Sequence, residues 1–288
     1  MKIDLHSHTK CSDGELSPEE LVLRASNKGV DVLAITDHDT VSALEPARDA
    51  IIKHKLPLKL VAGVEISTRW HGFEIHVVGL NIDDKQPELV ALLTQQQNTR
   101  DKRAEKIAAK LARVLPESYG FTAETIMQKV LEKAQGQSIS RVHFAKTLLE
   151  AGIVDRMQQA FDKYLGRKGK AYAAPEWISV EQAIAAIKAA GGHAVLAHPT
   201  RYDLKNKWVR KLVDYFADHQ GDAIEVGLPR QNNNELIQLA TYAQQAKLKS
   251  SQGSDFHRVS SYTELGNLLP LPEFCEPIWT DWQLVNPA

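Results

Sequence analysis

Cysteine is scarce in this sequence, and long apolar runs are missing. Only Cys11 and Cys275 occur among 288 residues, far apart in the chain, so neither a disulfide framework nor a cysteine-based zinc site is indicated. No apolar stretch approaches the roughly 18 residues of a membrane span. The first residues also lack the basic and apolar segments of a secretory signal. We therefore expect a cytoplasmic protein with no membrane partner, and no protein partner is indicated.

The sequence also lacks the short motifs of several enzyme classes. It contains no glycine-rich fingerprint of a nucleotide cofactor and no motif of a serine or cysteine nucleophile. Its hydrophobic content of 43% and charged content of 25% are those of an ordinary globular protein. The length is sufficient for one large α/β domain, or for such a domain with an insertion.

Charge is unevenly distributed along the chain. Residues 96–170 contain 15 Lys and Arg against 8 Asp and Glu, a net charge of +7, whereas the remainder carries -8. A solvated basic helix face would explain this pattern. The alternative is a basic lobe that attracts a polyanionic substrate toward an acidic body.

Predicted strands and helices alternate through most of the chain. Ser17-Pro18-Glu19-Glu20 has the pattern of a capping box, which predicts a helix that ends before Gly29. A buried strand over 31–36 and a helix capped by Thr40 and running to about Lys55 follow. The other predicted elements are strands over 58–64, 73–79, 193–197, 222–227 and 249–253, a helix from Ser179 to 191 and a helix over 231–247.

The alternation is interrupted between residues 96 and 170. A charged helix over 100–115 is followed by more helix, with no convincing strand. We predict an α/β barrel of about seven strands formed by residues 1–95 and 171–288, with a helical, basic insertion domain at 96–170.

The first strand carries two histidines at a spacing that suits metal binding. His6 and His8 lie two residues apart, so both side chains point to the same face of the strand. Asp13 follows within a turn rich in Ser, Asp and Gly and can offer a carboxylate to a neighbouring ion.

Nearly every predicted strand ends in a potential metal ligand. The ends of parallel strands meet at one rim of a barrel, so residues far apart in sequence can converge there. Nitrogen and carboxylate ligands without thiolate suit Mn²⁺, Fe²⁺ or Zn²⁺. About nine ligands would hold two or three ions, which would lower the pKa of a water and favour hydrolysis. The candidate ligands, which are also the candidate catalytic residues, are His6, His8, Asp13, His38, Glu65, His76, His198, Asp255 and His257.

These motifs resemble the polymerase and histidinol phosphatase (PHP) family of metal-dependent phosphoesterases. The resemblance covers most of the chain and keeps the family's order of motifs. The matching segments are Asp4-Leu5-His6-Ser7-His8-Thr9 with Asp13, Ile35-Thr36-Asp37-His38-Asp39-Thr40, Gly63-Val64-Glu65, His76, Ala197-His198-Pro199 and Ser254-Asp255-Phe256-His257.

The resemblance implies a distorted (β/α)7 barrel with a trinuclear centre. One ion would be bound by His6, His8, Glu65 and Asp255, and the second by Asp13, His38 and His257. A third would be bound by His76, His198 and a bridging Glu65. Asp37 and Asp39 flank His38 and are candidates to orient it, with helix capping the alternative for Asp39.

Within the family, the chain is most similar to the 3′,5′-nucleoside bisphosphate phosphatases, whose bacterial members also resemble 5′→3′ exoribonucleases acting on short RNA. The resemblance implies manganese, with Zn²⁺, Fe²⁺ or Mg²⁺ as alternatives, and removal of phosphate from pAp-like compounds. Arg141 and Arg201 are suited to hold a second phosphate, and His143 to donate another hydrogen bond. Val142 stands where the family usually has proline. A surface role such as ion pairing is the alternative for each of these three residues.

Three other functions compete with this one. A histidinol-phosphate-type phosphatase would use the same chemistry but has no need of a basic insertion. An amidohydrolase also begins with His-x-His but usually relies on a carboxylated lysine, which no predicted strand end provides. A non-catalytic RNA-binding module would be expected to have lost ligands, and none is missing.

Overall fold

A ring of strands forms the centre of the computed structural model, which describes residues 1–260 and 262–282. All neighbouring strands of the ring are parallel except β4, which runs antiparallel to both β3 and β6. A short strand, β5 (Ile178–Ser179), pairs with β3 outside the ring. The order around the ring is β1 (Ile3–Asp4), β2 (Val32–Ile35), β3 (Lys59–Trp70), β4 (Phe73–Leu80), β6 (His193–Leu196), β7 (Ala223–Gly227) and β8 (Lys249–Gln252).

Backbone hydrogen bonds between the first and last strands close the ring. The Leu5 N–H donates to the Gln252 carbonyl at 3.1 Å, and Ser7 pairs with Phe256 as a parallel bridge. Glycine is required at this junction, because a Cβ at Gly253 would lie 2.2 Å from the His6 Cβ. The predicted α/β fold is confirmed, and the pairing gives seven ring strands, distorted by the antiparallel β4.

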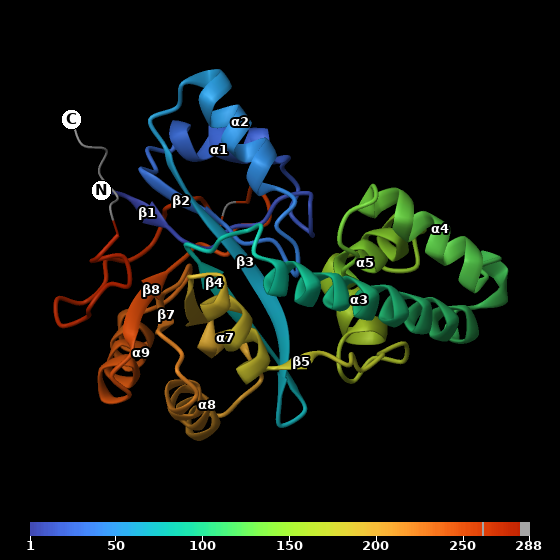
Figure 1. Ribbon diagram of the computed structural model, residues 1–288. Coiled ribbons are helices and arrows are strands. Elements are labelled where there is room, and N and C mark those ends of the chain that lie inside the picture. The colour runs from blue at the N-terminus through green and yellow to red at the C-terminus, as the bar shows by residue number, and fades with distance from the viewer. Residues whose placement is uncertain (261, 283–288) are drawn as a thin grey trace.

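Five helices lie outside the ring (Figure 1). Apolar side chains such as Leu5, Ala34 and Val195 fill its interior. The predicted capping box of Ser17 and Glu20 is present at the start of the first helix. The expected cap by Thr40 is wrong: its hydroxyl donates to Ser42, and the helix begins at Leu44 without a side-chain cap. The five helices are α1 (Pro18–Asn27), α2 (Leu44–His54), α7 (Val180–Ala189), α8 (Asn206–Asp218) and α9 (Asn233–Gln245), and a 3₁₀ turn spans Pro199–Arg201.

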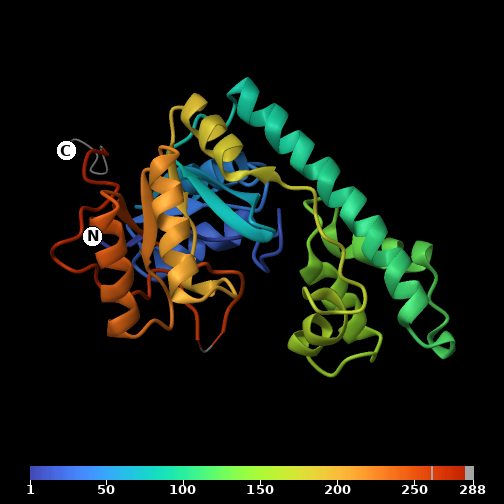
Figure 2. The ribbon, with the colours of Figure 1, turned by 90° about the horizontal axis from the view of Figure 1, so that it is seen from below.

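A helical lobe lies beside the ring and is joined to it by α3 and by the segment before β5 (Figures 1 and 2). It has a hydrophobic core of its own, which includes Leu111, Val130 and Phe144. Between β4 and β5 the described chain contains no strand. The lobe consists of α3 (Pro87–Val114), α4 (Ala123–Ala134), α5 (Arg141–Glu150) and α6 (Met157–Ala160), a 3₁₀ turn (Glu117–Tyr119) and a π turn (Phe161–Leu165).

The long helix α3 runs without a break through the predicted domain boundary at residue 96. Its first turns pack on the ring through Leu89 and Leu93, and its later turns enter the core of the lobe through Ile107 and Leu111. The division of the chain into 1–95 with 171–288 and 96–170 stays a prediction. Among the described residues, no helix is long and apolar enough to cross a membrane.

Candidate metal centre

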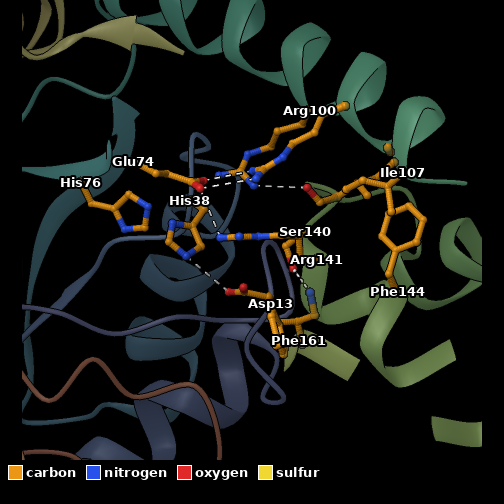
Figure 3. A pocket seen from close by; sticks show the side chains of 14 residues that line it. Asp13, His38, Glu74, His76, Arg100, Ile107, Ser140, Arg141, Phe144 and Phe161 are labelled. Atoms are coloured by element: carbon orange, nitrogen blue, oxygen red, sulfur yellow. Dashed lines mark hydrogen bonds and ion pairs between the residues drawn. The ribbon is translucent and has the colours of Figure 1, made fainter. Parts of the chain in front are cut away.

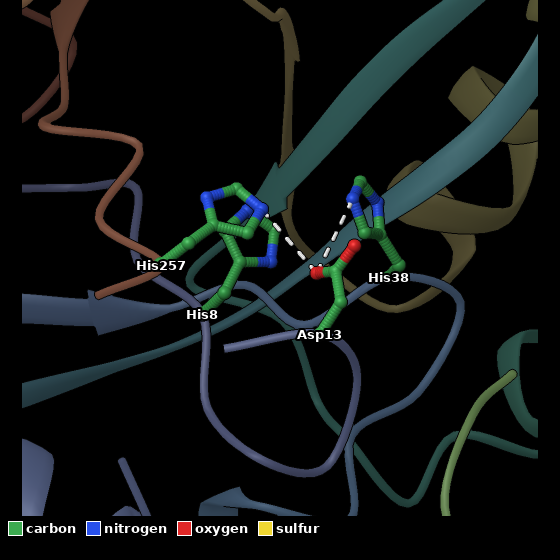
Figure 4. Close-up of side chains that lie close together, drawn as sticks. All are labelled: His8, Asp13, His38 and His257. Carbon is green, nitrogen blue, oxygen red and sulfur yellow. Dashed lines mark ion pairs between the residues drawn. The ribbon is translucent and has the colours of Figure 1, made fainter. Parts of the chain in front are cut away.

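The nine predicted ligands converge at one rim of the ring, as four overlapping groups of side chains. Within each group, the potential ligand atoms lie within 4.8 Å of one another. Figure 4 shows the group formed by His8, Asp13, His38 and His257. The other groups are His6 with Glu65 and His198, His6 with His8 and Asp255, and His38 with Glu65 and His76.

Four of these atoms have the spacing expected around a single ion. His6 Nε2 lies 3.1 Å from His8 Nε2, and each of the two nitrogens lies 3.3 Å from Glu65 Oε2. Asp255 Oδ1 lies 3.6 Å from the first nitrogen and 3.3 Å from the second. Ligand atoms at about 2.1 Å from an ion and at right angles to one another are about 3.0 Å apart, so this spacing fits a shared cation.

Glu65 lies in the middle of the cluster, and its two carboxylate oxygens face different histidines. Oε1 is 2.9 Å from His76 Nδ1 and 3.0 Å from His198 Nε2. Oε2 faces His6 and His8 and is also 2.9 Å from His38 Nδ1. A carboxylate in this position can bridge neighbouring ions.

Asp13 reaches the cluster from the loop after β1. Its Oδ1 lies 3.3 Å from His257 Nε2 and 3.8 Å from His38 Nε2. The loop turns tightly, because a Cβ at Gly14 would lie 2.5 Å from the His8 carbonyl oxygen. Asp37 holds the same loop by accepting hydrogen bonds from the Thr9 backbone N–H at 2.8 Å and the Ser12 hydroxyl at 2.5 Å.

Two of the ligands have backbone conformations that L-residues rarely adopt. His198 has a φ of 30° and Asp255 a φ of 50°, both in the left-handed region. Such strain persists where the surrounding structure enforces it, and it is concentrated at functional sites. His76 differs from the other ligands, because it lies in the middle of the antiparallel β4, opposite Ser67. The expectation that nearly every strand ends in a candidate ligand is therefore wrong for His76, and also for Glu65, which lies within β3 opposite Val78.

The cluster has the properties of a site for positive charge. Several of its buried atoms have no hydrogen-bond partner among the described residues, although they lie close together. Such atoms are costly to bury unless a cation or another partner satisfies them. The atoms are Asp13 Oδ1, His38 Nδ1, Glu65 Oε2, His198 Nδ1 and Asp255 Oδ1.

The electrostatics of the cluster agree with this interpretation. Burial alone would raise the pKa of Glu65, but the imidazoles of His38, His76 and His6 hold it well below its ordinary value, so it is a carboxylate. Burial favours the neutral ring of His257, yet Asp13 and Asp255 raise its pKa to about 10. The carboxylates thus draw protons onto the imidazoles, and divalent cations would supply the same positive charge. The donor set therefore fits a metal centre.

Sequence reasoning missed a residue that supports two ligands. Glu225 Oε1 lies 2.7 Å from His6 Nδ1, and its Oε2 accepts the His198 backbone N–H at 2.6 Å. A carboxylate that holds the second nitrogen of a metal-binding imidazole fixes the ring and its tautomer. The signal in the sequence was an acidic residue within the buried strand Ala223–Gly227.

Asp37 and Asp39 do not orient His38 as expected. Asp37 holds the Asp13 loop, and Asp39 accepts hydrogen bonds from Arg100 Nε at 2.8 Å and the Ser67 backbone N–H at 2.8 Å. Asp39 thus links the rim to α3.

A cavity of about 90 Å³ lies between the cluster and the helical lobe (Figure 3). Asp13, His38 and His76 form one side, and apolar residues including Ile107 and Phe144 form the other. Glu74 lies between two arginines, with Arg103 Nη1 at 3.0 Å and Arg141 Nη2 at 3.3 Å. Burial would raise the pKa of Glu74, but Arg141 and Arg103 hold it well below its ordinary value.

The three predicted substrate contacts lie in different surroundings. Arg141 lines the cavity beside the cluster. His143 is buried at the start of α5, where its Nδ1 accepts the Ser140 backbone N–H at 3.1 Å and completes a capping box. Arg201 is exposed, donates to the Pro229 carbonyl at 3.1 Å and lines a separate depression. The three substrate roles stay predictions.

His143 is neutral near pH 7. Burial is the largest cause that lowers its pKa, to about 4, and Lys146 and Arg100 also contribute. Since Nδ1 accepts a hydrogen bond, the neutral ring carries its proton on Nε2.

The closed α/β ring, with imidazoles and carboxylates gathered at one rim, places this chain among barrel proteins that have a candidate site for several metal ions. The chain belongs to the PHP family, since the family model described as the PHP domain matches residues 4–226.

Relatives match the chain over nearly its whole length. A 5′-3′ exoribonuclease of Escherichia coli is 47% identical over 281 residues, which cover 97% of this chain and 93% of the relative. A 3′,5′-nucleoside bisphosphate phosphatase of Chromobacterium violaceum is 35% identical, with 99% of each chain covered.

Solved structures share the fold. One from Chromobacterium violaceum, described as an amidohydrolase with bound sulfate and no metal, is 35% identical with a TM-score of 0.86 and covers 97% of this chain and 95% of its own. Another, from Bifidobacterium adolescentis and described as a metal-dependent phosphoesterase, is 26% identical with a TM-score of 0.80 and covers 93% and 92%.

Proposed function

We propose that the protein removes the 3′-phosphate from 3′,5′-nucleoside bisphosphates and also trims short 5′-phosphorylated RNA from its 5′ end. The observation that carries the proposal is the cluster around Glu65, which adjoins an arginine-lined cavity. Relatives named for these two activities match nearly the whole chain and support the proposal. The cytoplasm is the proposed location.

Manganese is the proposed metal, in two or three ions. His6, His8, Glu65 and Asp255 would hold one ion, Asp13, His38 and His257 a second, and His76 and His198 with Glu65 a third. Such ions lower the pKa of a water and offset the charge of a phosphoryl group during in-line displacement.

The remaining tasks fall to side chains of this chain. Glu225 fixes the His6 ring through Nδ1, so that Nε2 faces the cluster. Glu74 keeps Arg141 at the cavity wall through a single hydrogen bond, which leaves other guanidinium N–H groups to bind a 5′-phosphate. Two phosphates separated by a ribose would then be held together, one at the cluster and one at Arg141.

The proposal is tested with protein stripped by a chelator and reloaded with Mn²⁺, Zn²⁺, Fe²⁺ or Mg²⁺. Phosphate release is compared for pAp, 5′-AMP and histidinol phosphate, and a 5′-phosphorylated oligoribonucleotide is assayed for released nucleotides. We expect manganese to give the fastest turnover, with pAp preferred over both monoesters. Faster hydrolysis of histidinol phosphate would overturn the substrate assignment.

Metal content and thermal unfolding give readouts independent of activity. We expect two to three ions per chain by mass spectrometry, and a higher Tm after reloading, because ions that bind only the folded state stabilise it. A chain that binds no manganese and shows no shift of Tm would contradict the metal assignment.

A further inference from the structure

A groove of about 340 Å³ reaches the cluster from the side of α5 and α6. Asp13 and His257 lie at its inner end, and Lys146, Met157 and Arg258 line it further out. The groove shares Asp13, Val142 and Phe161 with the arginine-lined cavity described above. The two spaces are therefore neighbours, and in Figure 3 Phe161 lies on the Asp13 side of the first cavity, away from Arg100.

The groove is lined by two cations and an apolar wall, together with the carboxylates of Asp13 and Glu15. Lys146 Nζ has its nearest ion-pair partner, Glu15 Oε1, only at 4.0 Å. Arg258 is exposed, directly follows the candidate ligand His257, and forms no ion pair with any described residue. Met157 and Phe161 are partly buried and present apolar surface between these cations.

We propose that this groove binds the part of an RNA chain that continues beyond the phosphate being cleaved. The inference rests on the proposed function, in which Arg141 binds the 5′-phosphate of the first nucleotide in the other cavity. The scissile phosphate then lies at the cluster, and the groove is the second space that opens onto it. Its volume is in the range of small-ligand pockets. Lys146 and Arg258 suit the next phosphate, and Phe161 suits a base face.

The bond changes are the same for both substrates. The oxygen of a water bonds to phosphorus, the bond from phosphorus to the ribose O3′ breaks, and a proton from the water ends on O3′. With pAp, the products are a nucleoside 5′-monophosphate and inorganic phosphate. With RNA, they are the same nucleotide and a chain one nucleotide shorter that carries a new 5′-phosphate. Only RNA has a group that occupies the groove.

The test compares pAp with the 5′-phosphorylated dinucleotide pApA and a 5′-phosphorylated decamer in the manganese-loaded protein. We expect K146Q/R258Q to lower kcat/KM for the two RNA substrates by about ten-fold or more, because charge-assisted contacts are lost. Turnover of pAp should stay within about two-fold, because pAp has no group beyond the scissile phosphate that Lys146 or Arg258 could contact. The matched control is K207Q/R210Q, which removes two exposed cations from α8, away from α5 in Figure 1.

Salt dependence gives a second readout for the decamer. Each phosphate contact on a single strand contributes about 0.7 to the slope of log affinity against log salt, so the double variant should have a slope shallower by about 1.4. The control variant should keep the original slope.

Each outcome separates the groove from the proposed function. Equal losses on pAp and RNA would place the groove in the nucleotide site itself, and unchanged RNA turnover would remove it from RNA binding; either overturns the inference. Hydrolysis of pAp but not RNA by the unaltered protein would also overturn it while leaving the phosphatase function intact. If neither substrate is hydrolysed, the proposed function is wrong and the inference falls with it.

Discussion

The rim of the ring and its junction with α3 both bury charged side chains, but they satisfy them differently. At the junction, Asp39 is paired with Arg100 at 2.6 Å, and Glu74 with Arg103 at 3.0 Å. At the rim, Asp13, Glu65 and Asp255 each retain a buried oxygen without a hydrogen-bond partner among the described residues.

This contrast separates charges that are paired within the protein from charges whose oxygens have no hydrogen-bond partner among the described residues. Breaking a satisfied buried pair leaves one charge uncompensated and destabilises the protein. Removing the Glu65 carboxylate takes away the partner of the neighbouring imidazoles, so it should also lower stability, although its larger effect should be on activity. Substitutions at the rim should therefore act mainly on activity, and substitutions at the junction should act mainly on stability.

The largest expected effect is on activity, at the rim. Glu65→Gln removes the charge shared by two groups of potential ligands and should lower kcat for pAp by about 10³-fold or more, equivalent to about 4 kcal/mol. Urea unfolding of the metal-free variant should show a lower free energy of unfolding than that of the unaltered protein, because the imidazoles that lower the pKa of Glu65 lose their partner. A variant that retains most of its activity would remove Glu65 from the metal centre.

The next effect is on stability, at the junction. Arg100→Met leaves the buried Asp39 carboxylate without its partner and should lower the free energy of unfolding by about 3 kcal/mol. Lys102→Met, at an exposed position on the same helix, is the matched control and should change it by less than about 0.5 kcal/mol. Similar unfolding curves for the two variants would show that the junction is not distinct from the surface.

The rim could be predicted from the sequence because its ligands fall in recognisable motifs. His6 and His8 lie two residues apart just after β1, on either side of the bridge residue Ser7, and Asp255 and His257 follow the last strand closely. The bridging position of Glu65 followed only from the family resemblance, and the position of His76 in the middle of an antiparallel strand was not predicted.

The junction could not be predicted, because its residues look ordinary in the sequence. Arg100 and Arg103 occur among many exposed Lys and Arg in a charged helix, and nothing in their spacing shows that they are buried. Their burial depends on where α3 packs, which is set by tertiary contacts with Asp39 and Glu74. Likewise, the support that Glu225 gives to His6 depends on residues 219 positions apart.

A smaller effect, on KM, is expected at Arg141, where the rim and the junction meet. Arg141→Ala should raise KM for pAp about ten-fold, because one charge-assisted contact to the 5′-phosphate is lost. KM for adenosine 3′-monophosphate, which has the scissile phosphate but no 5′-phosphate, should change little. Steady-state kinetics on both substrates measure the difference.

The control for Arg141 is Lys129→Ala, which removes an exposed cation from α4 in the same lobe. This variant should leave both KM values unchanged. An equal rise in KM for the two substrates of Arg141→Ala would argue against a grip on the second phosphate and for a general role in attracting anions.

The smallest effect on the free energy of unfolding is expected at a partly exposed ion pair that belongs to neither region. It shows what such a pair contributes to stability outside any candidate site. Glu264 Oε2 lies 2.6 Å from Arg24 Nη2 and 3.0 Å from Lys28 Nζ. Partial burial would raise the pKa of Glu264, but these two cations lower it to about 2. Because solvent screens the pair, Glu264→Gln should lower the free energy of unfolding by only about 1 kcal/mol near neutral pH, with unchanged activity.

The difference in free energy of unfolding between the unaltered protein and Glu264→Gln should shrink as the pH falls. A carboxylate whose pKa is lowered by folding stabilises the protein above its unfolded pKa of 4.5 and loses that contribution as the pH falls toward its folded value of about 2. Urea unfolding of the unaltered protein and of Glu264→Gln should therefore give free energies of unfolding that differ by a constant amount from neutral pH down to about pH 5. Below about pH 4.5 the difference between the two free energies should shrink. A difference that grew on acidification would mean that the neutral, not the ionised, carboxyl is the form that folding favours, and the ion pair would then explain none of the stability at this position.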